Sequence, residues 1–260
     1  MAEPSLRTER AGPIARIIFQ RPERLNALTL DVQRAVVDAA TSLSTESGLR
    51  VVIIGGDGGT FTAGADLGML EELHTSGDID PAHADLGRKM IDAVEAIPAI
   101  TIARIDGHCV GGGVVLAAAC DLRLAAADTY FAIPEVDLGI PLAWGAVPRL
   151  VREIGPARAL ELIATCRAFT AAEALAMGFV NRVVPRNELK GEVEELAELL
   201  ASKPDYALKA VTSSVRAAAE SLAEAKGMVS DAELVVGAAG RSEGADAAKA
   251  YLERHRRSRS

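Results

Sequence analysis

Short apolar runs of strand length, separated by stretches of helical periodicity, constrain the fold of this chain more than any other feature. Val51 to Ile54 reads VVII, which is fully apolar and therefore predicts a strand covered on both faces. Ile14 to Phe19 and Ile100 to Ile105 are two further predicted strands. Strands that alternate with helices in this way predict an α/β fold with mostly parallel strand pairing.

The intervening stretches carry recognisable helix boundaries. Thr29 is suited to cap a helix that runs to about Ser44, and Thr170 with Glu173 forms a capping box for a later helix. Proline ends a predicted helix at Pro98. The other predicted elements are a helix beginning near Asp66, a helix over 81–97, strands over 122–126, 130–132 and 180–184, and helices throughout the residues after Asn187.

Composition excludes several classes of protein. The 260 residues are 49% hydrophobic and 25% charged, which is ordinary for a packed globular chain. The formal net charge of −8 argues against nucleic acid as a partner, because affinity for phosphates needs a clustered positive surface. The first residues lack the apolar core of a signal peptide, and charges interrupt every apolar run before the ~20 residues that span a bilayer. We therefore expect no membrane association and a cytoplasmic location.

Two strand-to-helix junctions are rich in glycine: Phe61 to Asp66, and Gly107 to Gly113. Such junctions leave free backbone N–H groups at the start of the next helix, where developing negative charge is stabilised. Two of them that converge would form an oxyanion hole for an enolate. Either junction alone could equally be a simple turn or a phosphate cradle, although the GxGxxG and GxxxxGK[ST] patterns of nucleotide sites are absent.

In their order along the chain, the motifs resemble the crotonase superfamily of enoyl-CoA hydratases and isomerases. The matching stretches are RPERLNAL (21–28), FTAGADL (61–67), IDGHCVGGG with CDLRLA (105–125), FAIPEVDLGI (131–140) and FTAAEALAMGFVNRVVP (169–185). The resemblance implies a crotonase-type spiral core of repeated ββα units with a C-terminal helical segment. It places the core domain at 1–186 and the helical segment at 187–260, which we expect to form homotrimers or hexamers.

The resemblance also implies roles for particular residues. The two oxyanion-hole donors would be the backbone N–H groups of Ala65 and Gly112, the latter preceded by Gly111. Acyl- and enoyl-CoA thioesters are the implied substrates, so coenzyme A enters as part of the substrate, and neither a metal nor a redox cofactor is implied. The residues expected to contact the coenzyme A moiety are Arg24, Asn26, Ala27, Ala63, Gly64, Asp66 and Leu67, and Gly111 and Val115 complete the expected substrate-binding residues.

The carboxylates of the site decide which reaction is expected. Family hydratases use two glutamates on opposite sides of the substrate, and here one of them is matched by Glu135 while Val115 occupies the position of the other. A single carboxylate can take a proton from one carbon and return it to another, which is the pattern of Δ3-Δ2 enoyl-CoA isomerases. Three alternatives stay open. The first is a true hydratase, in which Glu135 works alone or another group such as Asp137 replaces the missing acid. The others are a thioester hydrolase or decarboxylase, and a non-catalytic acyl-CoA-binding protein.

Other residues near the motifs are expected to be structural. Asp66 is predicted to cap the start of a helix, and Asp121 follows a helix end. Glu135 could itself be structural, capping the turn after Pro134. The single tryptophan, Trp144, is expected to pack in the core, with the pocket wall as the alternative.

Overall fold

The computed structural model describes residues 5–66, 68, 81–222, 231–239 and 241–257. Within them, a larger sheet has the strand order β1-β2-β3-β4-β6-β9, and a smaller sheet has the order β5-β7-β8. The strands are β1 (Leu6–Ala11), β2 (Ile14–Phe19), β3 (Val51–Gly56), β4 (Ile100–Ile105), β5 (His108–Val110), β6 (Leu122–Ala126), β7 (Tyr130–Ala132), β8 (Phe169–Thr170) and β9 (Arg182–Val184). From β2 to β9 the larger sheet is parallel, as predicted, and only the edge strand β1 is antiparallel.

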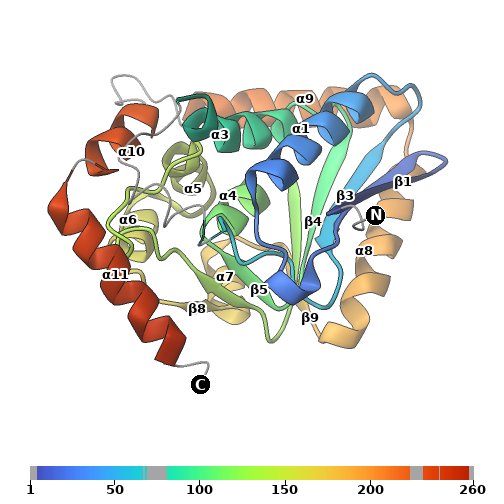
Figure 1. Ribbon diagram of the computed structural model, residues 1–260. Coiled ribbons are helices and arrows are strands. Elements are labelled where there is room, and N and C mark those ends of the chain that lie inside the picture. The colour runs from blue at the N-terminus through green and yellow to red at the C-terminus, as the bar shows by residue number, and fades with distance from the viewer. Residues whose placement is uncertain (1–4, 67, 69–80, 223–230, 240, 258–260) are drawn as a thin grey trace.

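Helices connect the strands and cover both faces of the larger sheet (Figure 1). They are η1 (Pro22–Arg24), α1 (Leu30–Ser44), α3 (Pro81–Glu95), α4 (Gly112–Ala118), α5 (Ala146–Ile154), α6 (Pro156–Thr165), α7 (Ala171–Met177), α8 (Arg186–Ala201), α9 (Asp205–Leu222), α10 (Asp231–Ala239) and α11 (Ser242–Arg257). No helix in the described part of the chain is long and apolar enough to cross a bilayer. The predicted helix beginning near Asp66 lies almost wholly outside the described residues.

Strand β3 shows why a fully apolar run was informative. Val52 and Ile54 face a core cluster that also contains residues of α1, α3 and α4, whereas Val51 and Ile53 face a second cluster on the opposite side of the sheet. Because successive strand residues point to opposite faces, a strand buried on both sides must be apolar at every position. Full burial of each such side chain stabilises the fold by about 1.5–3 kcal/mol.

Helix α8 closes the second face of the sheet. Its residues Leu189, Val193, Ala197 and Ala201 recur every four positions and are all buried against β2, β3, β4 and β6. This helix belongs to the predicted C-terminal segment 187–260, yet it completes the core of the sheet. The division at 186 and 187 remains a prediction, but it does not separate two independent cores among the described residues.

The predicted helix boundaries agree with the structure to within about two residues, and one predicted strand is shorter than expected. The sequence did not predict β1, β5, β8, α5 or α6. Thr29 accepts a hydrogen bond from the Val32 N–H at the start of α1, and Thr170 with Glu173 forms the capping box of α7. Strand β9 begins at Arg182 rather than at Val180. The Phe179 and Val180 N–H groups both bond to the carbonyl of Ala174, so these residues still complete the end of α7.

Candidate active site

The segment that follows β3 runs between two others and is fixed on both sides. On one side, the Thr62 N–H donates to the carbonyl of His108 at 2.9 Å and the Val110 N–H donates to the carbonyl of Thr62 at 3.2 Å. On the other side, the Ala63 N–H donates to Leu25 and the Gly64 carbonyl accepts from Leu28. The predicted RPERLNAL, FTAGADL and GHCVGGG segments are therefore adjacent strips of backbone in the folded chain.

Asn26 holds the first of these strips in place. It is 1% exposed, and its backbone has the left-handed φ of 54°. Its side-chain amide donates to the carbonyls of Asp57 and Thr60 at 3.0 and 2.7 Å, and its oxygen accepts from the Arg21 N–H at 2.8 Å. The side chain of Asn26 is thus committed to the scaffold, and any contact with coenzyme A would have to come from its backbone.

The two glycine-rich junctions meet, as an oxyanion hole requires. Gly64 has φ of 83°, and a Cβ at this position would lie 2.4 Å from the Val110 carbonyl oxygen and 3.2 Å from the Gly112 nitrogen. Only glycine allows so close an approach. Among the described residues, neither the Ala65 N–H nor the Gly112 N–H donates a backbone hydrogen bond. The N–H groups of Ala65 and Gly112 therefore lie on adjacent turns of the backbone and are free to donate a hydrogen bond to a ligand.

Each glycine of the GGG run faces a different neighbour. A Cβ on Gly111 would lie 2.4 Å from Oε1 of Glu135, one on Gly112 would lie 2.2 Å from the Trp144 ring, and one on Gly113 would lie 2.8 Å from Cγ2 of Thr62. A Cβ at any of these positions would displace a packed group. The run is therefore needed because three separate parts of the chain crowd against the start of α4.

Glu135 lies on the turn that follows β7 and projects onto this junction. Its carbonyl accepts from the Leu138 and Ile140 N–H groups, each at 3.0 Å, which fixes the turn. Its carboxyl oxygen Oε2 is buried and has no hydrogen-bond partner among the described residues. Burial without a compensating charge raises the pKa of Glu135 from 4.5 to about 7. The carboxyl can therefore change its protonation state near neutral pH beside the two free N–H groups.

Val115 lies three residues after Gly112 on α4 and is 1% exposed. It belongs to the main apolar cluster, in which α4 is buried along its whole length. An apolar side chain therefore occupies the position at which a second carboxylate was considered. Asp137, the alternative acid, is exposed and points toward Arg254 of α11, with 4.0 Å between the charged atoms.

The remaining predicted contact residues surround the junction unequally. Arg24 is exposed at the end of η1, Ala27 is buried, and Ala63 and Asp66 are partly buried. Asp66 accepts a hydrogen bond from the Gly68 N–H at 3.0 Å, as a capping side chain does. Leu67 lies outside the described residues.

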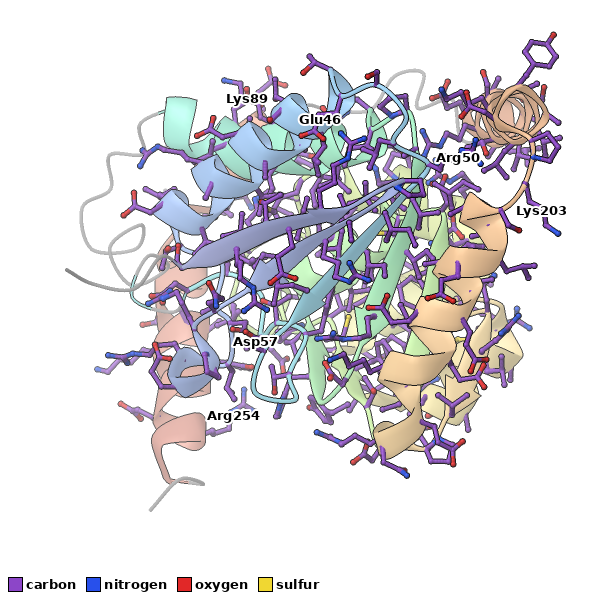
Figure 2. All side chains as sticks on the ribbon, turned by 90° about the vertical axis from the view of Figure 1, so that its right-hand side faces the viewer. Glu46, Arg50, Asp57, Lys89, Lys203 and Arg254 are labelled. Atoms are coloured by element: carbon purple, nitrogen blue, oxygen red, sulfur yellow. The ribbon has the colours of Figure 1, made fainter. Side chains whose placement is uncertain are left out.

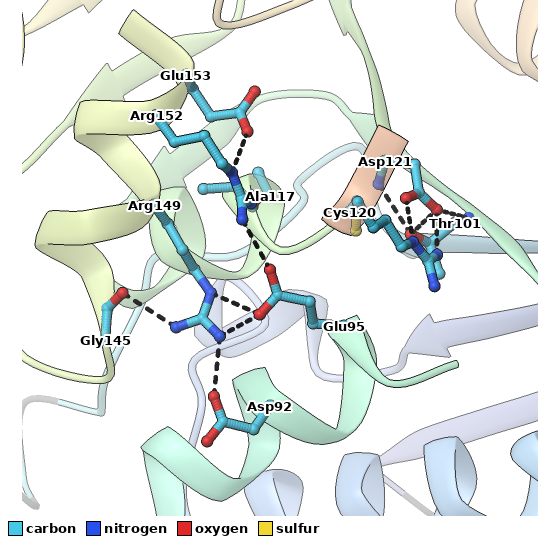
Figure 3. A network of polar contacts seen from close by, with 12 residues as sticks. Asp92, Glu95, Thr101, Ala117, Cys120, Asp121, Gly145, Arg149, Arg152 and Glu153 are labelled. Atoms are coloured by element: carbon cyan, nitrogen blue, oxygen red, sulfur yellow. Dashed lines mark hydrogen bonds and ion pairs between the residues drawn. The ribbon is translucent and has the colours of Figure 1, made fainter. Parts of the chain in front are cut away.

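Asp121 is structural, as expected. Its carboxylate accepts from the N–H and hydroxyl of Thr101 (Figure 3). It also pairs with Arg216 of α9 at 2.5 Å. Trp144 is half-buried against the main core cluster, as expected, and it also touches the candidate hole at Gly112. Sequence reasoning did not identify its second neighbour, Gly87 of α3, because no local motif links the two positions.

The same arrangement of sheets and helices occurs in solved structures of known enzymes. The crystal structure of an enoyl-CoA hydratase/carnitine racemase from Magnetospirillum magneticum superposes with a TM-score of 0.78 at 33% identity, covering 84% of this chain and 82% of that one. The predicted fold class is thereby confirmed: this is a crotonase fold.

Sequence comparison identifies the family within that fold. The family model described as enoyl-CoA hydratase/isomerase matches residues 9–258. A crotonyl-CoA hydratase of Syntrophomonas wolfei is 35% identical over 210 residues, which are 80% of each chain. A peroxisomal Delta(3,5)-Delta(2,4)-dienoyl-CoA isomerase of Arabidopsis thaliana is 36% identical over 214 residues, 78% of this chain and 77% of that one. The chain belongs to the enoyl-CoA hydratase/isomerase family, and it is an enzyme of the hydro-lyase or isomerase type.

Proposed function

We propose that this protein shifts a double bond in enoyl-CoA thioesters, as a Δ3-Δ2 enoyl-CoA isomerase, and that Glu135 moves the proton. Its carboxyl is buried next to Gly111, and its pKa of about 7 is suited to a group that both accepts and returns a proton. The turn around it is fixed by hydrogen bonds to its own carbonyl, so the carboxyl is held by a rigid support.

The free N–H groups of Ala65 and Gly112 would receive the thioester oxygen. As the C2 proton leaves, negative charge accumulates on this oxygen, and backbone donors ~3 Å away stabilise it most strongly where water is excluded. Each such donor contributes a factor of ~10²–10³ to the rate in enzymes of this type. Because both donors belong to the backbone, the hole depends on local chain geometry and not on any side chain.

The proposed reaction balances with one carboxylate. Glu135 removes a proton from C2 of a 3-enoyl thioester, the C2–H electrons form a C1–C2 double bond, and the carbonyl electrons move onto the thioester oxygen. In the resulting dienolate the C3–C4 double bond is still in place. The protonated Glu135 then delivers the same proton to C4: the C3–C4 electrons form the new C4–H bond, the C1–C2 electrons form the C2–C3 double bond, and the carbonyl is restored. No water is consumed, and the carboxylate is regenerated.

The observation that carries the proposal is the burial of Val115. Hydration needs a water molecule and a second group that positions it, whereas Val115 is apolar, 1% exposed and enclosed by the main cluster. A buried aliphatic side chain can neither orient water nor transfer a proton. The isomerase reaction is compatible with this arrangement, because it requires only Glu135.

Hydration is the second candidate, and the names of relatives favour it. The Syntrophomonas wolfei protein, 35% identical to this chain, is a crotonyl-CoA hydratase. In a hydratase built on this site, Glu135 would have to activate water alone, or Asp137 would have to turn inward from Arg254.

For the coenzyme A moiety, we propose contacts from the strips on either side of the hole. Arg24 is an exposed cation suited to a phosphate group, and Ala63, Gly64 and Asp66 border the Ala65 donor. Ala27 and Asn26 would contribute backbone atoms only, because Ala27 is buried and the Asn26 side chain is committed to the scaffold.

We also propose that the enzyme assembles as a homotrimer or hexamer through its helical segment. Helix α9 lies beyond the sheet and is seen end-on at the upper right of Figure 2. It has no buried residues, and three of its exposed large apolar side chains, Val211, Val215 and Leu222, share one face of the helix, whereas Tyr206 lies on the opposite side. An apolar helix face of this kind is normally covered by a partner. Light scattering of the purified protein would give the assembly mass.

The deciding experiment compares two substrates on one enzyme preparation. We expect rapid conversion of 3-hexenoyl-CoA to 2-hexenoyl-CoA and much slower hydration of crotonyl-CoA. Asp137→Asn should retain isomerase activity, because Asp137 stands outside the proposed proton path. Robust hydration by the wild type, with no detectable isomerisation, would establish the hydratase instead.

A further inference from the structure

Trp144 packs between two glycines that belong to different helices. A Cβ on Gly112 would lie 2.2 Å from Cζ3 of the indole, and one on Gly87 would lie 2.1 Å from Cε2 and Nε1. The six-membered ring of the indole is therefore in contact with α4 at the candidate hole, while its pyrrole side contacts α3. The absence of side chains at both positions makes room for this one ring.

The backbone that carries the ring is held in an uncommon conformation. Trp144 has φ of 63° and Gly145 has φ of 70°, and a left-handed backbone is rare for a bulky residue. Two groups hold the turn: Asp231 of α10 accepts the Gly145 N–H at 2.5 Å, and Arg149 of α5 donates to the Gly145 carbonyl at 3.0 Å. Figure 3 shows the Arg149 bond within its network of ion pairs with Asp92 and Glu95.

The ring lies close to where a thioester would react. The Gly112 nitrogen is about 1.5 Å from its Cα, a ring atom in contact with that Cα is ~3.5–4 Å away, and an accepted hydrogen bond adds ~2.9 Å. Even if these three distances add along a straight line, the indole edge lies within roughly 8 Å of the oxygen of a bound thioester. Val115 shares this face of α4, because residues three apart on a helix are neighbours.

We propose that Trp144 determines substrate specificity by forming the wall of the acyl site next to the thioester carbonyl. This inference rests on the proposed function, since it requires an acyl-CoA thioester bound at Gly112. A flat, rigid ring held by Asp231 and Arg149 limits the width of the site beside C2 of the acyl chain. Unbranched acyl groups fit next to such a wall, whereas a branch at C2 collides with it.

Intrinsic fluorescence tests the location of the ring directly, because Trp144 is the only tryptophan in the chain. The wild-type protein is titrated with coenzyme A and, separately, with butyryl-CoA, whose saturated chain cannot be isomerised. We expect butyryl-CoA to shift the emission maximum to shorter wavelength, and coenzyme A alone to leave it unchanged. Identical responses to both ligands would place the ring away from the acyl group.

Calorimetric titration with two isomeric ligands tests specificity without any turnover. Butyryl-CoA and isobutyryl-CoA have the same atoms and differ only in a branch at C2. The wild type should bind butyryl-CoA at least about tenfold more tightly, which is the discrimination that one misplaced methyl group produces in an apolar site. Trp144→Ala should reduce this ratio to below about threefold, and Trp144→Phe should retain most of it.

Leu189→Ala supplies the matched control. Leu189 is a large, buried side chain in the cluster on the opposite face of the sheet, so its loss weakens the fold without touching the acyl site. The butyryl to isobutyryl ratio should be unchanged in this variant. Should Trp144→Ala fail to fold, Trp144→Phe and the fluorescence titration still decide the proposal.

The outcomes separate this inference from the proposed function. Isomerase activity combined with an unchanged ligand ratio in Trp144→Ala would overturn the role of Trp144 and leave the function standing. Discrimination that depends on Trp144, without isomerase activity, would support the acyl wall and overturn the proposed reaction. Absence of binding by either ligand would overturn both.

Discussion

Replacement of Glu135 by glutamine should stabilise the protein at alkaline pH while it abolishes catalysis. Burial raises the pKa of Glu135 from 4.5 to about 7, so the folded protein holds this proton more tightly than the unfolded chain does. A raised carboxyl pKa means that stability is fully present below about pH 4.5 and is lost as the pH rises through 7. At about 1.4 kcal/mol per pKa unit, the buried carboxylate costs about 3 kcal/mol above pH 8.

Glutamine has a similar shape and stays neutral at every pH, so the variant avoids this cost. We expect the free energies of unfolding of wild type and Glu135→Gln to agree at pH 4.5 and to differ by up to about 3 kcal/mol at pH 8.5, with the variant more stable. Urea denaturation at the two pH values, at one fixed protein concentration, measures the difference.

The same substitution should lower turnover by ~10²–10⁴-fold, the usual loss when a general base is removed. In the wild type, kcat/KM should rise with pH through about 7, as Glu135 becomes a carboxylate able to accept the proton. A stability difference that is the same at both pH values would show that Glu135 is not buried as described. Full activity in the variant would move the base elsewhere.

Three further changes test the surroundings of Glu135. Gly112→Val should abolish turnover, because its side chain would meet the Trp144 ring at 2.2 Å; a folded, active variant by circular dichroism and assay would contradict the proposed hole. Val115→Glu should destabilise the protein by several kcal/mol in urea titrations, because it buries a carboxyl without a partner, and should raise the ratio of hydration to isomerisation. Asn26→Ala should cost about 2–3 kcal/mol in thermal unfolding, since it leaves the buried Thr60 carbonyl and the partly buried Asp57 carbonyl without this donor. An unchanged melting temperature would show that the hydrogen bonds of the Asn26 side chain are dispensable.

The secondary structure was largely predictable from local sequence, and the reason is visible in the strands and caps. The alternating burial of Val51 to Ile54 on two faces explains why the run has no polar residue. Thr170 and Glu173 make a cap from bonds within four residues, so no distant contact is needed to predict it. The late start of β9 was not predictable, because it depends on how α7 ends and where Arg123 of β6 pairs with Asn181.

The motifs of the candidate site could also be recognised from the sequence, but the roles of their side chains could not. The family resemblance implied Asn26 as a ligand contact, which stays a prediction. The structure adds that the Asn26 side chain joins two loops about thirty residues apart in sequence. Trp144 was expected in the core, and it is also the neighbour of Gly112. In both cases the deciding contact joins residues far apart in the chain, and no local pattern encodes it.

The resemblance to a known family supplied the prediction that Val115 stands where a second carboxylate would be. By itself, the sequence determined five of the six strands of the larger sheet and the glycine-rich junctions. These follow from residue type, spacing and hydrophobic periodicity, which act locally along the chain. Only the tertiary structure decided that Gly64 meets Gly112, that Glu135 crowds Gly111, and that burial brings the Glu135 pKa to about 7. The physical reason is that close approach and desolvation depend on which distant segments pack together, and packing is a property of the whole folded chain.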